Sequence, residues 1–149
     1  MPGAILHVLG RSLGGDVDAA RAASTEGVVA DLRYAEPGEW AGAMLRADVV
    51  VLPYRSIDQS GVLATAIALG RPVVATDVGG FGETLADTGA GLLVPPRDPA
   101  ALGATIAALL LDAELRASLG AAAAAAARGE LSWDRSAERH EQIYAWAAA

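Results

Sequence analysis

A strand–loop–helix–strand unit over residues 48–76 constrains the fold more than any other feature of this chain. Residues 48–52 (DVVVL) form an apolar run of strand length, and a polar loop leads from it into a helical segment at residues 61–69. Gly70 ends that segment, and residues 72–76 (PVVAT) follow at once as a second apolar run. Continuously apolar runs are typical of strands buried on both faces, as in parallel sheets covered by helices.

The same alternation continues along the chain and predicts an α/β fold, a parallel sheet with helices on both faces. We expect strands at residues 4–9, 28–34, 48–52, 72–76 and 91–94. We expect helices at residues 16–23, 37–46, 61–69 and 81–86. The remainder is predicted to be helical, with Asp98, Asp112 and Ser132 as the N-caps of three successive helices.

Length and composition limit the possible partners. The 149 residues suit one domain, and 53% of them are hydrophobic, which is ample for a core. The net charge of -7 argues against nucleic acid and anionic lipid as main partners. There is no cysteine and there are only two histidines, so we expect no disulfide framework and no metal site. No apolar run approaches the ~20 residues of a membrane span, which favours a cytoplasmic domain.

The loop meets its helix at Gln59, Ser60 and Gly61, which form a candidate anion site. The first N–H groups of a helix have no partner within it, and the helix dipole places partial positive charge there. Gly61 has no side chain to keep a ligand away from the backbone. The loop also follows the carboxyl end of a strand, where ligands bind in such sheets. The pattern predicts a phosphate site; the structural alternative is an ordinary N-cap followed by a flexible glycine.

Four segments occur in an order and spacing that carry a family resemblance: ADVVVLPY (47–54), ATAIALGRPVVATDVGG (64–80), GLLVPPRDPAAL (91–102) and LSWDRSAER (131–139). Together they resemble the C-terminal domain of family 4 (group 1) retaining glycosyltransferases, which have the two-domain GT-B architecture. LHVLGR (6–11) and VADLRY (29–34) resemble the two strands before this block. The resemblance implies a single Rossmann-like domain, residues 1–149, that binds a nucleoside diphosphate sugar.

The resemblance also implies where each part of the donor lies. The diphosphate is expected at the start of the helix, by Ser60, Gly61 and Val62, and the base at the turn after Tyr34. In the family an acidic residue on that helix holds the ribose, and Thr65 stands at its position here. A hydroxyl can hydrogen-bond ribose, but the bond is not charge-assisted.

The other acidic position of the family motif E-x7-E falls at Ile57 or, with a shift of one residue, at Asp58. Asp58 is therefore a candidate sugar or ribose contact, with an Asx-turn as the alternative. Arg11 is a candidate phosphate contact or a solvated surface arginine. Glu83 is a candidate sugar contact or a first-turn glutamate favoured by the helix dipole. Structural roles, in the core or at its rim, are expected for His7, His140, Trp40, Trp133 and Trp146.

Two parts of the family pattern are missing from this sequence. In the family, another strand–helix unit precedes residues 6–11 and brings an Arg–Lys pair that neutralises the diphosphate. An acceptor-binding N-terminal domain completes the catalytic cleft. We therefore expect that this chain alone is not a competent transferase. An exposed sheet edge would favour self-association.

The leading hypothesis is the donor-binding domain of a hexosyltransferase-type glycosyltransferase, which transfers a sugar from a nucleoside diphosphate donor to an acceptor with retention. The resemblance implies no metal or cofactor, and no general acid or base can be assigned. The alternative is a non-catalytic nucleotide-binding or interaction module of GT-B origin, favoured by Thr65 and by the missing start. A sugar-nucleotide epimerase of the same architecture is a third hypothesis.

Overall fold

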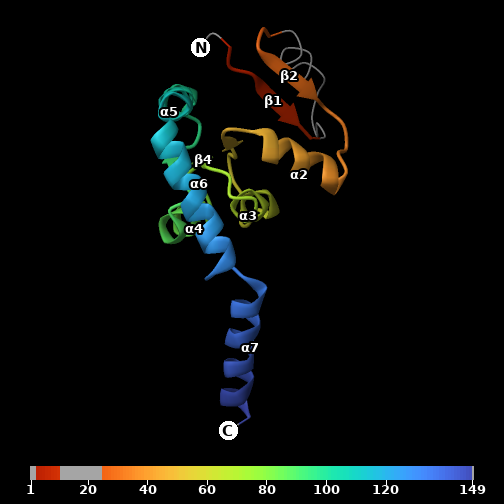
Figure 1. The fold of residues 1–149 in the computed structure, drawn as a ribbon, viewed down its shortest axis with the longest axis vertical. Helices are drawn as coiled ribbons and strands as arrows, with labels where there is room; N and C mark the ends of the chain where they lie inside the picture. The colour runs from red at the N-terminus through yellow and green to blue at the C-terminus, as the bar shows by residue number, and fades with distance from the viewer. Residues whose placement is uncertain (1–2, 11–24, 149) are drawn as a thin grey trace. The chain divides into compact units, whose positions relative to one another are not determined.

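The computed structural model describes residues 3–10 and 25–148 of the chain (Figure 1). The helix expected at residues 16–23 and the candidate Arg11 lie outside the described residues. The chain divides into two compact units, residues 1–43 and 44–149, and each is described here by itself. The single domain expected over residues 1–149 stays a prediction.

The first unit contains a two-stranded parallel sheet of β1 (Leu6–Leu9) and β2 (Val28–Asp31), paired Leu6 to Val28 through Leu9 to Asp31. The prediction that β1 is a buried strand with a packed His7 is wrong, because Leu6 and His7 are exposed. Two strands alone offer few neighbours to cover a side chain. The unit also contains the start of α2 (Pro37–Arg46), whose bounds the sequence predicted.

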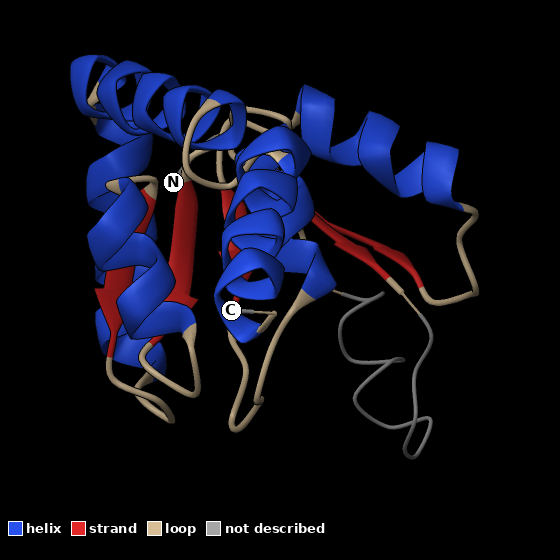
Figure 2. Cartoon of the chain, turned by 90° about the horizontal axis from the view of Figure 1, so that it is seen from below, coloured by secondary structure: helices blue, strands red, loops and turns tan. Residues whose placement is uncertain are grey.

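The second unit is built on a three-stranded parallel sheet in the order β3 (Val50–Leu52), β4 (Val73–Thr76), β5 (Gly91–Val94). The helices flank the strands (Figure 2). They are α3 (Gly61–Ala68), α4 (Phe81–Thr88), α5 (Pro99–Leu111), α6 (Ala113–Arg128) and α7 (Trp133–Ala147). The predicted α/β class, with parallel strands and Rossmann-like character, is confirmed.

The central strand β4 is wholly buried and divides the core into two clusters. Val73 and Ala75 pack with residues of α3 and α4, among them Ile67 and Phe81. Val74 packs with Val94 and with residues of α5 and α6, Leu109 and Leu119. Because successive residues of a strand point to opposite faces, helices cover both faces of this sheet, as predicted.

The helix ends follow local signals in the sequence. Asp98, Asp112 and Ser132 are the N-caps of α5, α6 and α7, as predicted, and each side chain accepts a bond from a backbone N–H three residues ahead. The helix α4 runs two residues beyond its predicted end at 86, because Gly89 supplies a left-handed C-cap (φ 62°).

The last helix, α7, has no buried residue, so the expected anchoring role of its tryptophans is wrong for the described chain. The exposed fractions of Trp133 and Trp146 are 90% and 81%. Figure 1 shows α7, in blue, extending from the end of α6. Glu130 pairs with Arg139 and, at 3.8 Å, with Arg135, so ion pairs join the segment before α7 to its first turns.

Candidate functional site

The candidate site is the start of α3, where the loop from β3 ends. Ser60 is the N-cap, with extended backbone (φ -133°, ψ 113°), and its Oγ accepts a bond from Leu63 N–H at 3.3 Å. Within the described residues, the N–H groups of Gly61 and Val62 have no acceptor, as helix geometry requires. A Cβ added at Gly61 would meet nothing within 4 Å. Two N–H groups are therefore open to a ligand at this end of α3.

Thr65 lies one turn into α3 and is half-buried. Its Oγ1 donates to the Gly61 carbonyl at 2.8 Å, so the hydroxyl proton is held by the helix itself. The oxygen lone pairs remain available, and Thr65 can act toward a ligand only as an acceptor while this bond persists.

The loop before α3 turns some side chains to the core and others to solvent. Ile57 is half-buried and packs against the core cluster, whereas Asp58 and Gln59 are exposed. The first acidic residue of the E-x7-E motif was expected at Ile57 or Asp58, and the exposed position of the two, Asp58, is the one that carries a carboxylate.

Asp58, Gln59 and Ser60 lie together on the rim of a hollow of about 710 Å³. Leu63 and Ile67 of α3 and Phe81 of α4 line its interior, and all three are buried. The lining also includes Glu83 of α4 and the first residues of α7, Trp133 and Asp134. The hollow thus joins the start of α3 to polar groups from two other helices.

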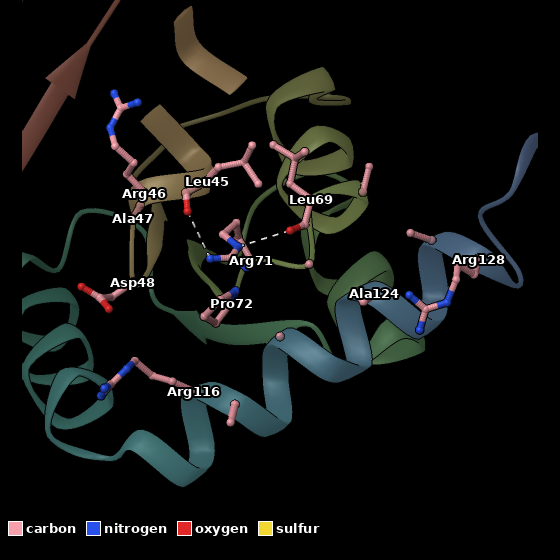
Figure 3. Close-up of a pocket in the computed structure, with 15 residues that line it drawn as sticks. Leu45, Arg46, Ala47, Asp48, Leu69, Arg71, Pro72, Arg116, Ala124 and Arg128 are labelled. Atoms are coloured by element: carbon pink, nitrogen blue, oxygen red, sulfur yellow. Dashed lines mark hydrogen bonds between the residues drawn. The ribbon is translucent and has the colours of Figure 1, made fainter. Parts of the chain in front are cut away.

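A larger hollow, of about 1080 Å³, lies at the other end of the sheet and is lined by four arginines (Figure 3). Two of them bind helix ends: Arg71 donates to Leu69 O (3.2 Å) and Leu45 O (3.4 Å), and Arg116 donates to Leu109 O (2.8 Å) and Leu110 O (2.6 Å). Asp48 and Pro72, which precede β3 and β4, place this hollow at the amino ends of the strands. Ligands of parallel sheets bind at the carboxyl ends, so the smaller hollow is the candidate site.

The turn that contains Tyr34 lies in the first unit and is held by a charged network. Arg33 pairs with Asp31 at 3.0 Å and, through two bonds, with Glu39 at 2.8 and 3.0 Å, and it donates to Tyr34 O at 3.1 Å. Glu36 N–H donates to Glu39 at 2.8 Å. The hydrogen bond from Arg33, followed by that from Glu36, lowers the pKa of Glu39 to about 2. The hydrogen bond to Glu39 and the charges of Asp31 and Glu39 raise the pKa of Arg33.

The strand β2 ends at Asp31 and not at residue 34 as predicted, because its partner strand β1 ends at Leu9, the residue that pairs with Asp31. Tyr34 itself is 67% exposed. The structure brings Asp58, Gln59, Ser60, Gly61, Val62 and Thr65 together in the second unit. Tyr34 belongs to the first unit, which is described separately.

Three residues contact the site loop in a way that the sequence analysis did not predict: Thr76, Gly79 and Gly80. Thr76 donates from Oγ1 to Tyr54 O at 2.6 Å, and Gly80 N–H donates to Asp58 O at 3.3 Å. The sequence signal for them was the glycine pair that follows a strand. That signal marks a turn without saying which loop the turn contacts.

A family model described as "Glycosyl transferases group 1" matches residues 4–112, most of the chain. The chain belongs to this glycosyltransferase family. Among curated members, it is 42% identical over 101 residues to D-inositol 3-phosphate glycosyltransferase of Xylanimonas cellulosilytica, covering 68% of this chain and 24% of that protein. The corresponding enzyme of Salinispora arenicola is 36% identical over 130 residues, covering 85% and 29%. This family member therefore spans about a quarter of the length of those relatives.

Solved structures confirm the C-terminal GT-B fold. The superposition with sucrose-phosphate synthase from Thermosynechococcus elongatus covers 100% of this chain and 40% of the synthase chain, with a TM-score of 0.76 and 26% identity. The superposition with the C-terminal domain of a group 1 glycosyltransferase (LpcC) from Francisella tularensis covers 87% of this chain and 70% of that domain, with a TM-score of 0.73 and 19% identity. HepE from Anabaena, solved in complex with UDP, gives a TM-score of 0.77 at 20% identity, over 100% of this chain and 42% of HepE. The last two similarities show the fold alone.

None of the helices in residues 3–10 and 25–148 is long and apolar enough to cross a membrane. Within the same residues, no group of three or more His, Asp or Glu side chains is placed to hold a metal ion.

Proposed function

We propose that this domain binds the nucleotide-sugar donor of a glycosyltransferase, with the diphosphate at the start of α3. The observation that carries the proposal is the pair of unpaired N–H groups at Gly61 and Val62, open to solvent at the carboxyl end of β3. Helix starts of this kind attract anions through these N–H groups and the helix dipole. Family membership supports a nucleoside diphosphate as the anion.

In this proposal the domain assists sugar transfer by stabilising the leaving group. As the bond between sugar and diphosphate breaks, negative charge grows on the diphosphate oxygens. N–H groups already aimed at those oxygens favour that state without reorganising. The sugar then passes to an acceptor with retention at the anomeric carbon, as in a hexosyltransferase. No residue of this chain is assigned as a general acid or base.

The remaining contacts of the donor follow the same proposal. Gln59 and Asp58 contact the sugar or ribose from the rim of the hollow, and Thr65 accepts a bond from a ribose hydroxyl. The base lies at the turn after Tyr34, and Arg11 binds phosphate. These assignments rest on the family resemblance and on the exposure of Asp58, Gln59 and Tyr34.

One observation favours a second function, a nucleotide-binding module without catalysis. At the ribose position Thr65 carries a neutral hydroxyl whose proton is bonded to Gly61 O. Without a carboxylate, ribose loses a charge-assisted bond. Release or transfer of sugar from a bound donor would decide for the transferase.

The test is calorimetric titration of the full chain with UDP, GDP, ADP and their sugar conjugates. We expect binding of at least one, and a loss of at least about tenfold in affinity in Gly61→Asp, because its carboxylate would stand at the phosphate position. Gly103→Asp is the matched control, since Gly103 is exposed on α5 and an added Cβ meets nothing within 4 Å. Binding of none at millimolar concentration contradicts the proposal, and equal affinity of Gly61→Asp contradicts the placement of the phosphate.

A further inference from the structure

The segment that leaves β4, residues 76–81, holds the site loop where the loop leaves the sheet. Thr76 is the last residue of β4, and its side chain is 4% exposed. Its Oγ1 lies 2.6 Å from Tyr54 O and 3.4 Å from Leu52 O. Pro53, between those two residues, has no N–H with which to continue the ladder from β3. The hydrogen bond from the Thr76 hydroxyl therefore connects the two strands beyond the point where their backbone hydrogen bonds end.

The same segment holds the loop again at its middle. Gly79 has φ +52°, and the position of a Cβ there is occupied by the Ile57 carbonyl, well inside van der Waals contact. Gly80 N–H donates to Asp58 O at 3.3 Å. Glycine is required at residue 79 for two reasons, the left-handed backbone and the close approach of the loop. Two successive loop carbonyls thus rest on the Gly79–Gly80 turn.

Apolar contacts fix the relative position of the two segments. The rings of Tyr54 and Phe81 meet edge to face, with centroids 5.6 Å apart and planes at 74°. Phe81 is 1% exposed, and Ile57 and Val78 pack against the same core cluster. The loop from Tyr54 to Asp58 is therefore anchored at both its side chains and its carbonyls, directly before Gln59 and Ser60.

We infer that Thr76, Gly79 and Gly80 are positioning residues for the diphosphate, because they set the path of the loop that aims the Gly61 and Val62 N–H groups. None of the three needs to touch the ligand. The inference rests on the proposed function, since it assigns the diphosphate to those N–H groups. A shift of about 1 Å in such a group is enough to lower the rate of a catalysed reaction by on the order of 100-fold.

The first test is Gly79→Ala, titrated with inorganic pyrophosphate and with UDP. The added Cβ must displace the Ile57 carbonyl, so both affinities are expected to fall by at least about tenfold. Gly89→Ala is the matched control: Gly89 has φ +62°, and its added Cβ would lie 3.7 Å from Ala122 Cβ, an ordinary contact. The two variants share the backbone strain, and only Gly79→Ala moves the loop. The inference is overturned if Gly79→Ala, like Gly89→Ala, binds pyrophosphate and UDP as tightly as the unmodified chain does.

The second test separates the hydroxyl of Thr76 from its shape. Thr76→Val leaves Tyr54 O without its donor and is expected to weaken pyrophosphate binding by about fivefold or more, whereas Thr76→Ser keeps the donor and restores binding. Thr88→Val is the control, since the Thr88 hydroxyl donates to Thr84 O at 2.7 Å and accepts from Ala90 N–H at 3.3 Å, and neither partner belongs to the site loop. A serine variant as weak as the valine variant would argue against the hydroxyl bond as the cause.

Hydrogen exchange gives a readout that does not depend on ligand. Faster exchange is expected in Gly79→Ala and Thr76→Val for the amides of Leu63 and Gly80, which donate to Ser60 Oγ and Asp58 O, with the amides of β4 and α5 unchanged. Faster exchange throughout would indicate a general loss of stability and contradict positioning. If the unmodified chain binds neither probe, the proposed function fails and the inference fails with it. If the unmodified chain binds and the loop variants bind equally well, only the positioning role fails.

Discussion

At Thr65 the hydroxyl that is expected to meet a ribose is already bonded to the helix backbone. The bond to Gly61 O, at 2.8 Å, ties the first turn of α3 to the side chain one turn later. A ligand hydroxyl can donate to Thr65, but a Thr65 that donates must first break this bond. The side chain therefore offers one acceptor, where a glutamate would offer two charged oxygens.

Arg33 and Glu39 permit a prediction of pH dependence. The pKa of Glu39 is lowered from 4.5 to about 2, so its contribution to folding is present above pH 4.5 and is lost as the pH falls through about 2. Carbon-detected NMR of the Glu39 carboxyl should show one titration step near pH 2. In Arg33→Met the step should return toward the ordinary pKa. A Glu39 that titrates near 4.5 in the unmodified chain would contradict the bidentate pairing with Arg33.

At the scale of the element, α3 and α7 start in the same way, and both starts line the smaller hollow. Ser60 and Ser132 each accept a bond from the backbone three residues on, at 3.3 and 3.2 Å. Only the start of α3 follows a strand and lies beside the loop held by β4. A comparison of Ser60 with Ser132 therefore distinguishes the effect of an N-cap on helix stability from its effect on ligand binding.

Ser60→Ala and Ser132→Ala should each cost about 1 kcal/mol of helix stability. If the loss is felt in global unfolding, it lowers Tm by roughly 2–4 °C. Pyrophosphate affinity should fall in Ser60→Ala and remain unchanged in Ser132→Ala, as measured by calorimetry beside thermal unfolding by circular dichroism. Equal affinities in the two variants would show that the cap does not help to arrange the anion site.

Local sequence signals predicted the helices and their caps, because an N-cap and the residue that it bonds are three positions apart. The bounds of α2 and β5 and the caps Asp98 and Asp112 are as predicted. The exposure of His7 and Trp133 could not be read in this way, because burial depends on distant segments. The roles of Thr76 and Gly79 were missed for the same reason: their partners, Tyr54 and Ile57, lie more than 20 residues earlier.

At the scale of the whole molecule, the two units have different means of holding themselves together. Among the described residues, Ala35 is the one core residue of the first unit, and the other buried hydrophobic side chains belong to residues 44–149. The first unit relies on the Arg33 network and on two short strands. Exposed ion pairs contribute little to stability compared with an apolar core.

A fragment of residues 44–149 should therefore fold alone, whereas residues 1–43 should not. The larger fragment is expected to show one cooperative thermal transition by circular dichroism and dispersed amide resonances by NMR, because its sheet has helices on both faces. The full chain serves as the control, measured at the same concentration, with light scattering to test the predicted self-association. A non-cooperative transition in the larger fragment would contradict the assignment of the core to the second unit.

The strand order β3-β4-β5 has a consequence for biosynthesis. Within this sheet, β4 lies beside β3 and β5 lies beside β4, and one helix connects each pair. Once β3 has left the ribosome, β4 and then β5 thus find their partner strands already made, and neither must wait for a distant segment to be translated. Since domains fold from the N-terminus during synthesis, this sheet can grow by adding one strand at a time. The loop between β3 and α3 reaches its final path only when β4 has emerged.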